Sequence, residues 1–326
     1  MQLPLDLRSA TTHLLEGVSR KSLGERSARI SENYRAGGGS AVGVRDSEDA
    51  LAYVIARLPA TYAATRNVLS RLAERVPEFR PRTVLDLGAG PGTASWAMMD
   101  AWSSIETIVQ VDQNRQMLEL GKRLAASAAH AALREARQVV GDLARVAEAE
   151  AKADLVVLSY TLAELNTSQI IAVVRDAWRR CEGALVIVEP GTPSGYERIL
   201  QARSLLLAEG AHVAAPCPHA LPCPLTRPDW CHFTQRVART RDHLLVKSAS
   251  VPYEDERFSY LIVVRESLSL TAQQGRVLAA PQIDKARLAA KVCSVAGTVE
   301  QARIRKRDKE LFARVKKLEW GDELPA

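Results

Sequence analysis

The feature that most constrains the fold of this chain is a short apolar run that ends in three alternate glycines. Residues 83–87 (Thr-Val-Leu-Asp-Leu) have the composition of a buried parallel strand, and Gly88, Gly90 and Gly92 follow directly. Residues 94–102 then favour a helix. A strand, a glycine-rich turn and a helix in this order predict a nucleotide-type pocket at the carboxyl edge of a doubly wound sheet. Side chains in the turn would keep a ligand away from the backbone.

Acidic residues stand at two positions near this turn, one just before it and one at the end of the next apolar run. Asp86 lies two positions before the first glycine, and Asp112 ends a second apolar run, 24 residues beyond Gly88. A carboxylate at the second position can accept hydrogen bonds from both hydroxyls of a ribose. The loop reads G-x-G-x-G, whereas dinucleotide-binding loops read G-x-G-x-x-G. It resembles motif I of the class I S-adenosylmethionine-dependent methyltransferases, which implies that cofactor, with Asp86 near its methionine end. The alternative is a glycine turn without a ligand, and the register of both acids favours binding.

The alternation of elements after residue 80 predicts the sheet. Apolar runs at 83–87, 107–111, 137–140, 154–159 and 184–189 read as strands, and the clearest helices between them are at 114–128 and 167–180. Such alternation implies an α/β fold with a parallel sheet covered by helices on both faces. Residues 258–264 form a late strand, expected to be antiparallel as in the class I methyltransferases.

The first 80 residues are expected to form a helical cap beside the pocket, with a break at the glycines 37–39. Asp46 begins a run suited to a helix N-terminus, and residues 58–62, which include Pro59, are expected to interrupt this helix before a second one at 63–76. Helix packing, rather than contact with the pocket, is the expected role of the nearby polar side chains of Tyr53, Arg57 and Tyr62.

Residues after the third and fourth strands are further candidates for the site. Asp142 and Leu143 follow the third strand, where methyltransferases commonly contact the adenine, although an Asp that caps a turn is nearly as well supported. Ser159 ends the fourth strand, at the position that faces the methyl group in class I enzymes. Tyr160 and Glu164 are weak candidates for orienting or deprotonating a nucleophile. Neither an Asn/Asp-Pro-Pro-aromatic sequence nor a cysteine stands there, so the sequence does not predict the methyl acceptor.

A proline-rich segment after residue 212 holds an unusual set of side chains. Cys217, Cys223 and Cys231, together with His219 and His232, fall within 16 residues that cannot form a regular helix or strand. A metal centre would order such a loop by joining its ligands directly. Disulfides are disfavoured, because the sequence predicts no secretion signal and we expect a cytoplasmic protein.

Zinc and an iron–sulfur cluster both remain open for this segment. The spacing C-x5-C-x7-C differs from the C-x2-C of common zinc modules, and irregular, proline-flanked cysteines suit a cluster held by thiolates. A cluster needs a fourth ligand. Cys181 ends a predicted helix of the sheet and reads as a packing thiol, whereas Cys293 lies in the C-terminal region and is able to close the site from a distance.

The chain as a whole resembles the methyltransferase-like proteins associated with the mitochondrial small ribosomal subunit and their bacterial relatives. The resemblance rests on residues 52–62, the glycine loop, residues 159–165 and 188–191, and most closely on residues 216–233, with 255–260 and 317–322. It implies a [4Fe–4S] cluster held by Cys217, Cys223, Cys231 and Cys293. It also implies the small subunit and its rRNA as partners, in assembly and translation, and leaves open whether the protein methylates anything.

Charge is concentrated near the C-terminus. The net charge is +6, and residues 303–317 alone hold eight Lys or Arg against Asp308 and Glu310. Such a basic segment fits either a phosphate backbone as partner or a solvated helix face. No run is long and apolar enough to span a bilayer, so no membrane contact is expected. We expect the protein in the cytoplasm, or in the mitochondrial matrix of a eukaryote.

The sequence therefore predicts three regions. Residues 1–80 form the cap, residues 81–266 the S-adenosylmethionine-binding domain with a cysteine-rich insertion at about 212–236, and residues 267–326 a small basic β/helix unit in which 276–280, 287–295 and 298–304 read as strands. Two functions stay open: an RNA methyltransferase with a structural metal site, or a non-catalytic assembly factor. The absence of an acceptor motif favours the second, and the intact cofactor loop favours the first.

Overall fold

A mostly parallel sheet organises the computed structural model, which describes residues 2–35, 38–143 and 152–324. Seven of its strands follow the order β3-β2-β1-β4-β5-β8-β6. The eighth, β7, also pairs with β8. The strands are β1 Thr83–Leu87, β2 Thr107–Asp112, β3 Arg137–Val140, β4 Ala153–Ser159, β5 Cys181–Pro190, β6 His212–Ala215, β7 Phe233–Ala238 and β8 Tyr253–Val264.

The direction of the strands gives the fold class. Strands β1 to β5 are parallel, while β8 runs antiparallel to both β5 and β6. This is the strand arrangement of a class I methyltransferase, and it confirms the expected α/β fold and the antiparallel late strand. Because parallel strands share one carboxyl edge, the ends of β1, β2, β4 and β5 meet on the same side of the sheet.

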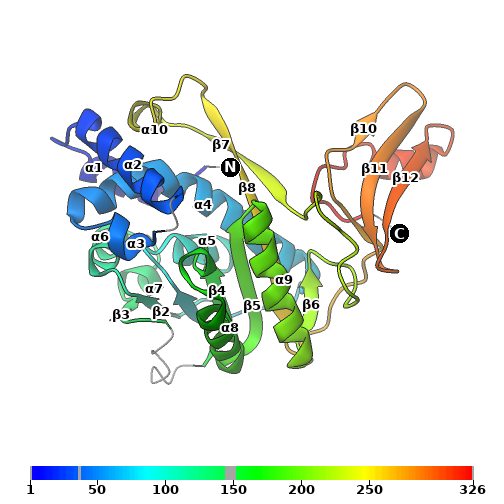
Figure 1. Cartoon of the computed structure of the whole chain (residues 1–326), viewed down its shortest axis with the longest axis horizontal. Coiled ribbons are helices and arrows are strands. Elements are labelled where there is room, and N and C mark those ends of the chain that lie inside the picture. Colours follow the sequence, from blue (N-terminus) through cyan, green and yellow to red (C-terminus); the bar gives the residue numbers. More distant parts are fainter. Residues whose placement is uncertain (1, 36–37, 144–151, 325–326) are drawn as a thin grey trace.

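Helices cover both faces of this sheet (Figure 1). Alternate residues of each strand point to opposite faces, so two separate hydrophobic clusters form. Helices α4 (Ser47–Arg75), α5 and α6 contribute to one cluster, and α8 and α9 to the other. The helices are α5 Thr93–Ala101, α6 Arg115–Ala125, α7 Ala131–Arg134, the short 3-10 helix η2 Leu162–Glu164, α8 Thr167–Arg180, α9 Pro193–Ala208 and α10 Arg241–Val246.

The N-terminal helices lie against the first of these faces. They are α1 Leu5–Leu14, α2 Arg20–Arg35, α3 Ser40–Gly43 and α4 Ser47–Arg75. The break predicted at the glycines 37–39 falls between α2 and α3, with residue 37 itself outside the described residues. The predicted interruption at residues 58–62 is wrong, because α4 continues through Pro59. An internal proline costs about 3 kcal/mol, but α4 buries apolar side chains along most of its length, and each stabilises the fold by about 1.5–3 kcal/mol.

A small unit follows the main sheet, at the right of Figure 1. It consists of β9 Gly275–Val277, β10 Gln282–Ile283, β11 Arg287–Ser294, β12 Val299–Arg305 and α11 Lys309–Val315. Leu288, Ala290 and Val292 of β11 are buried in a separate cluster with Ile304 and Val315. The intervening residues of β11, Cys293 among them, therefore lie on the opposite face of this second sheet.

Among the helices that the structure describes, none combines the length and the apolar character needed to cross a bilayer.

Candidate cofactor pocket and cysteine cavity

A cavity opens at the carboxyl edge of the main sheet, where the glycine loop leaves β1. Most of the predicted cofactor residues line it, joined by side chains of α4 and of the segment after β4. The predicted residues among them are Asp86, Gly88, Gly90, Asp112, Leu143, Ser159, Tyr160 and Glu164. The fold thus brings together residues from the ends of β1, β2 and β4 and from the segment after β3.

The three glycines of the loop have different surroundings. All have a positive φ, which disfavours other residues. A Cβ on Gly90 would meet nothing within 4 Å, so this position faces open space in the cavity. On Gly88 it would lie 2.4 Å from Thr161 Oγ1, and on Gly92 it would lie 2.6 Å from Gln110 Nε2. Gly90 therefore lets a ligand approach the backbone, while Gly88 and Gly92 permit close packing behind the loop.

Asp112 ties the glycine loop to the end of β2. Its Oδ2 accepts a hydrogen bond from the backbone N–H of Gly90 at 2.7 Å, and Oδ1 accepts one from the N–H of Asn114 at 2.7 Å. Burial raises the pKa of Asp112 to about 6, against the opposing effect of these two bonds. A carboxylate has about four lone-pair sites, so Asp112 keeps acceptor capacity for a ligand.

Asp86 is buried at the floor of the cavity. Its Oδ2 accepts hydrogen bonds from the hydroxyl of Ser95 at 2.7 Å and from the N–H of Ser95 at 3.1 Å. No donor within the described residues reaches its Oδ1, although that atom is buried. Burial raises the pKa of Asp86 to about 7. A buried carboxylate oxygen without a donor suits a ligand that brings a donor or a positive charge.

The segment after β4 forms another wall. Tyr160 is a non-glycine residue with φ +59°, and its hydroxyl donates a hydrogen bond to Glu256 Oε1 at 2.9 Å. Arg57 donates to the same oxygen at 3.1 Å. The hydroxyls of Ser159 and Thr65 lie 2.9 Å apart, which connects β4 to α4.

Helix α4 takes part in the cavity, which the sequence did not predict. Tyr53 and Thr61 line it, so Tyr53 does more than pack between helices. Tyr62 instead donates to Asp100 Oδ2 at 3.1 Å, in agreement with its expected packing role. The hydrophobic pattern of α4 assigns all three positions to a buried face and gives no signal that separates a cavity wall from a packed core.

Of the two residues predicted to contact adenine, only one lines the cavity. Leu143 lines the cavity, whereas its neighbour Asp142 is half-buried and is not among the lining residues. Residues 144–151, which follow, lie outside the described residues. The sequence also missed Gln113 and Met117, which line the cavity from the segment after β2. Their only signal was their position next to Asp112.

A second cavity gathers four of the five cysteines. Cys217, Cys223, Cys231 and Cys293 all line it, together with Tyr196, Arg203 and Arg276. Burial raises the pKa of the Cys217 and Cys231 thiols, and that of Cys293 to about 12. Cys181 is buried in the hydrophobic cluster below α8, as expected for a packing thiol.

The cysteine loop is held by hydrogen bonds to its backbone. Arg203 of α9 donates to the carbonyls of His219 and Leu221, each at 2.8 Å. Ser259 of β8 donates to the carbonyl of Cys231 at 2.9 Å. Within the described part of the chain, no three His, Cys, Asp or Glu side chains are placed to hold a single metal ion. This finding supports neither the iron–sulfur cluster nor the zinc alternative, and both stay predictions.

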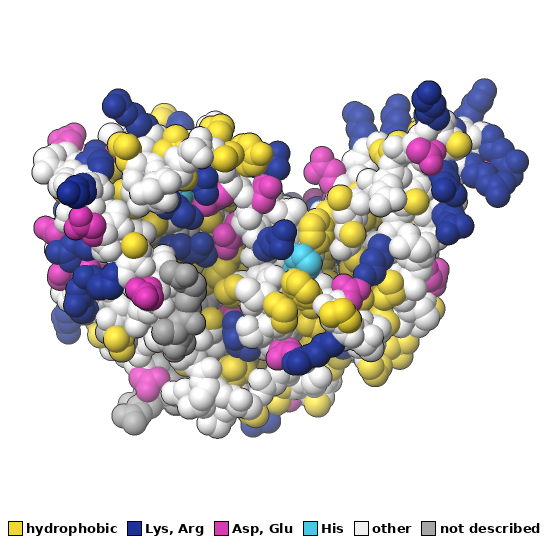
Figure 2. Space-filling view, turned by 45° about the horizontal axis from the view of Figure 1, so that its top comes forward, with side chains coloured by type: hydrophobic (Ala, Val, Ile, Leu, Met, Phe, Trp, Pro, Cys, Tyr) yellow, Lys and Arg dark blue, Asp and Glu magenta, His cyan; other side chains and the backbone are white. Residues whose placement is uncertain are grey.

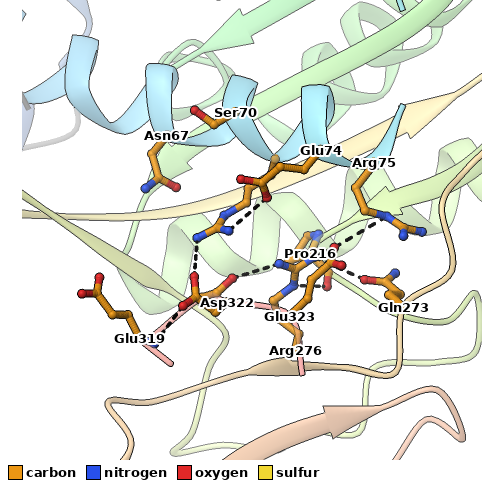
Figure 3. Close-up of polar contacts among 12 residues, drawn as sticks. Asn67, Ser70, Glu74, Arg75, Pro216, Gln273, Arg276, Glu319, Asp322 and Glu323 are labelled. Carbon is orange, nitrogen blue, oxygen red and sulfur yellow. Dashed lines mark hydrogen bonds and ion pairs between the residues drawn. The ribbon is translucent and has the colours of Figure 1, made fainter. Parts of the chain in front are cut away.

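The C-terminal unit joins the rest of the protein through a junction of buried charges (Figure 3). Arg276 of β9 is 1% exposed; it donates to the carbonyls of Pro216 at 3.0 Å and Gly321 at 2.9 Å, and pairs with Glu323 at 3.0 Å. Arg71 of α4 pairs with Asp322 at 2.9 Å. Residues 321–323 thus lie between α4 and β9, beside the cysteine loop.

The exposed Lys and Arg side chains of the C-terminal unit form its basic face, gathered on the right-hand lobe in Figure 2. The register pairs Arg287 with Arg305 across β11 and β12, so both side chains share the sheet face that carries Cys293. The basic face comprises Lys285, Arg287, Arg303, Arg305, Lys306, Arg307, Lys309, Arg314, Lys316 and Lys317.

Comparison with known proteins gives one family match and several relatives. The family described as mitochondrial small ribosomal subunit Rsm22 matches residues 47–325. The human protein named ribosome assembly protein METTL17, mitochondrial, is 28% identical over 289 residues, covering 84% of this chain and 62% of that protein. The fission yeast Rsm22-cox11 tandem protein 2, mitochondrial, is 25% identical over 235 residues, covering 66% of this chain and 31% of that protein. The chain thus spans less than two thirds of the length of either relative.

Solved structures of similar fold include an O-methyltransferase family protein from Burkholderia thailandensis, with a TM-score of 0.45 and 16% identity, covering 79% of this chain and 70% of that one. Another is the magnesium protoporphyrin IX methyltransferase of Synechocystis PCC 6803 with bound S-adenosylmethionine. Its TM-score is 0.42 at 15% identity, covering 68% of this chain and 85% of that one.

Proposed function

The chain belongs to the Rsm22 family of the mitochondrial small ribosomal subunit, and from this premise we propose that it binds S-adenosylmethionine and acts in the assembly of the small ribosomal subunit. The observation that supports cofactor binding is that Asp86, Gly90 and Asp112 line one cavity. The ribosomal role is supported by the family and by the human relative named as a ribosome assembly protein.

The residues of the first cavity fit S-adenosylmethionine. Open space beside Gly90 leaves room for the cofactor against the backbone. The buried Oδ1 of Asp86, which has no donor from the described residues, suits the ammonium group of the methionine part. Asp112 keeps lone pairs for the ribose hydroxyls, and Leu143 offers an apolar surface to the adenine. When bound, the cofactor supplies an electrophilic methyl group.

The second cavity fits an iron–sulfur cluster held by Cys217, Cys223, Cys231 and Cys293. Support comes from the donor set, because four thiols from the loop and from β11 line one cavity. A cluster is larger than one ion, so its four thiolates need not converge on a single point. It would supply a cross-link between the loop and the C-terminal sheet.

The basic face is our proposed contact with rRNA. It gathers exposed Lys and Arg side chains, the groups that bind a phosphate backbone, and of these Arg287 also pairs with Asp284 at 3.4 Å. Arg287 and Arg305 share a sheet face with Cys293, so the cluster would also fix the direction in which these arginines point. We place the protein in the mitochondrial matrix of a eukaryote or in the cytoplasm of a bacterium.

Two candidates share this cofactor and this partner. The first is an RNA methyltransferase. The second is a non-catalytic assembly factor, because cofactor binding does not require catalysis. The segment Ser159–Glu164 favours it, since it contains none of the acceptor motifs that act on exocyclic amines or through a cysteine. In that case the cofactor and the cluster would support the conformation that binds the subunit.

The test replaces Gly90 with tryptophan, which fills the space beside the loop. Gly210→Trp is a matched control, because Gly210 also has a positive φ and open surroundings but lies at the end of α9. We expect Gly90→Trp to lose binding of S-adenosylmethionine in calorimetry and Gly210→Trp to keep it. Transfer of labelled methyl groups to purified small subunits then separates the two candidates. Methyl transfer by the wild type that Gly90→Trp loses would support a methyltransferase, and cofactor binding by the wild type without any transfer would support the non-catalytic assembly factor. Equal binding by both variants would refute the cofactor site.

A further inference from the structure

A third cavity lies directly beside the cofactor pocket, and two tyrosines belong to both. Tyr53 and Tyr160 line the third cavity and the cofactor pocket, so they form the partition between them. The third cavity is also lined by Ser31 of α2, Ala56 and Arg57 of α4 and Pro190 at the end of β5. Its volume of about 270 Å³ lies just below the range of about 300–1,000 Å³ for small-ligand sites.

The position of Tyr160 at this partition is set by contacts with two strands that are distant in sequence. Its φ of +59° is unusual for a tyrosine, and such backbone strain of about 1–3 kcal/mol persists only when neighbouring contacts hold it. Here the Tyr160 N–H donates to the carbonyl of Val188 at 2.7 Å, and its hydroxyl donates to Glu256. Strands β5 and β8 therefore hold the ring between the two cavities.

The charges around this cavity suit a neutral ligand. Arg57 and Glu256 form an ion pair at 3.1 Å, so neither offers an unopposed charge. A phosphate would compete with Glu256 for Arg57, and a lysine side chain would compete with Arg57 for Glu256. One of the five N–H donors of Arg57 is used by Glu256 in this pair. A polar, uncharged group can therefore take up another of these donors.

We infer that this cavity holds one unstacked nucleobase of an RNA strand, presented toward the cofactor pocket. The inference rests on the proposed function, which supplies both the cofactor and the RNA. A base is planar and uncharged, and proteins bind unstacked bases against aromatic side chains and through hydrogen bonds to their edges. Tyr53 and Tyr160 provide the aromatic walls, and Arg57 donates to a carbonyl oxygen or ring nitrogen.

Binding of the free ribonucleosides tests this site on the full-length protein. Adenosine, guanosine, cytidine and uridine are added at millimolar concentration, with S-adenosylhomocysteine saturating the cofactor pocket, and contact is followed by saturation-transfer NMR. We expect at least one nucleoside to bind. Ser31→Trp fills the cavity from an exposed position of α2 and should abolish that signal. Ala28→Trp, at an exposed position of the same helix outside the cavity, should keep it. Arg57→Met should weaken binding about tenfold.

The outcomes separate this inference from the proposed function. Absence of S-adenosylhomocysteine binding to the wild-type protein would refute the cofactor site itself. If S-adenosylhomocysteine binds but no nucleoside does, or if Ser31→Trp and Ala28→Trp behave alike, the cofactor site stands and the base site is overturned.

Discussion

The backbone N–H of Gly90 and the carboxylate of Asp112 are joined by a hydrogen bond of 2.7 Å, so the glycine loop and the end of β2 form one unit. Gly90 gives the ligand room, and Asp112 both positions that glycine and retains acceptor capacity. Under the proposed function, these two features, which lie 22 residues apart in the sequence, would act on the same part of a bound nucleoside.

Replacing Asp112 with asparagine should weaken cofactor binding by roughly 10- to 100-fold, the effect of losing a charge-assisted hydrogen bond. The backbone N–H groups of Gly90 and Asn114 both donate to the carboxylate of Asp112. The amide NH2 of asparagine would face one of these two donors, and that hydrogen bond would be lost. Calorimetry with S-adenosylhomocysteine measures the change. Asp100→Asn is the control, because Asp100 contacts Tyr62 and Arg66 outside the cavity; a similar loss there would argue against a specific role for Asp112.

Asp86 should make the ligand-free protein less stable as the pH rises. Burial raises its folded-state pKa from 3.8 to about 7. Between these values the unfolded chain has released the proton that the folded protein keeps, so the free energy of unfolding falls with increasing pH, by at most about 1.4 kcal/mol per pH unit. The loss is complete above pH 7.

Asp86→Asn removes this titration, so denaturant unfolding of wild type and variant from pH 4 to pH 8 should show the wild type losing more stability. Parallel pH profiles would contradict the assignment. The same variant should lose cofactor affinity, because an amide does not attract the ammonium group as a carboxylate does.

The cysteines should divide into two groups by iron content. Protein purified without oxygen is expected to be brown and to contain iron and sulfide, and Cys231→Ser should lose both and loosen the C-terminal unit. Cys181→Ser should keep its iron, because Cys181 lies in the core below α8, outside the cysteine cavity. Metal analysis and visible absorption measure the difference. Zinc without iron in the wild type, or equal losses in both variants, would reverse the proposal.

Arg276→Met should release the C-terminal unit from the main sheet. Arg276 is buried and donates to the carbonyls of Pro216 and Gly321 and to Glu323, so its removal costs about 1–3 kcal/mol for each acceptor that stays buried without a donor. Hydrogen exchange should accelerate in β9–β12 and remain slow in β1–β5. Arg287→Met, an exposed change in the same unit, is expected to leave both rates unaltered. Uniform acceleration across the protein would instead indicate global destabilisation.

Neutralising the basic face should reduce the salt dependence of RNA binding. For the double variant Arg303→Gln/Arg305→Gln, the slope of log affinity against log salt with transcribed small-subunit rRNA should fall by roughly 0.7 per lost phosphate contact. The double variant Lys122→Gln/Arg123→Gln removes the same charge from exposed positions of α6. Identical slopes for these two variants would mean that net charge, rather than the basic face, governs binding.

The sequence predicted what depends on local pattern. Strand β1, the glycine loop and the acids at the strand ends follow from periodicity and from glycine chemistry, and the structure brings Asp86, Gly90 and Asp112 to one cavity. It did not predict the continuity of α4 through Pro59, because local propensity disfavours the helix and only burial against distant segments restores it. The pairing of Glu256 with Arg57 and Tyr160 was also hidden, since nothing in the sequence marks contacts between β8 and α4.

The junction at Arg276 has a consequence for the order of folding. The ion pair between Arg71 and Asp322 joins residues that are 251 positions apart, and that between Arg276 and Glu323 joins residues 47 apart. Closing so long a loop is entropically costly before its contacts form. Helix α4 and the main sheet can consolidate first, and the cysteine cavity reaches its final shape only when residues 321–323 settle against them. We therefore expect the thiol site to take its final shape late in folding.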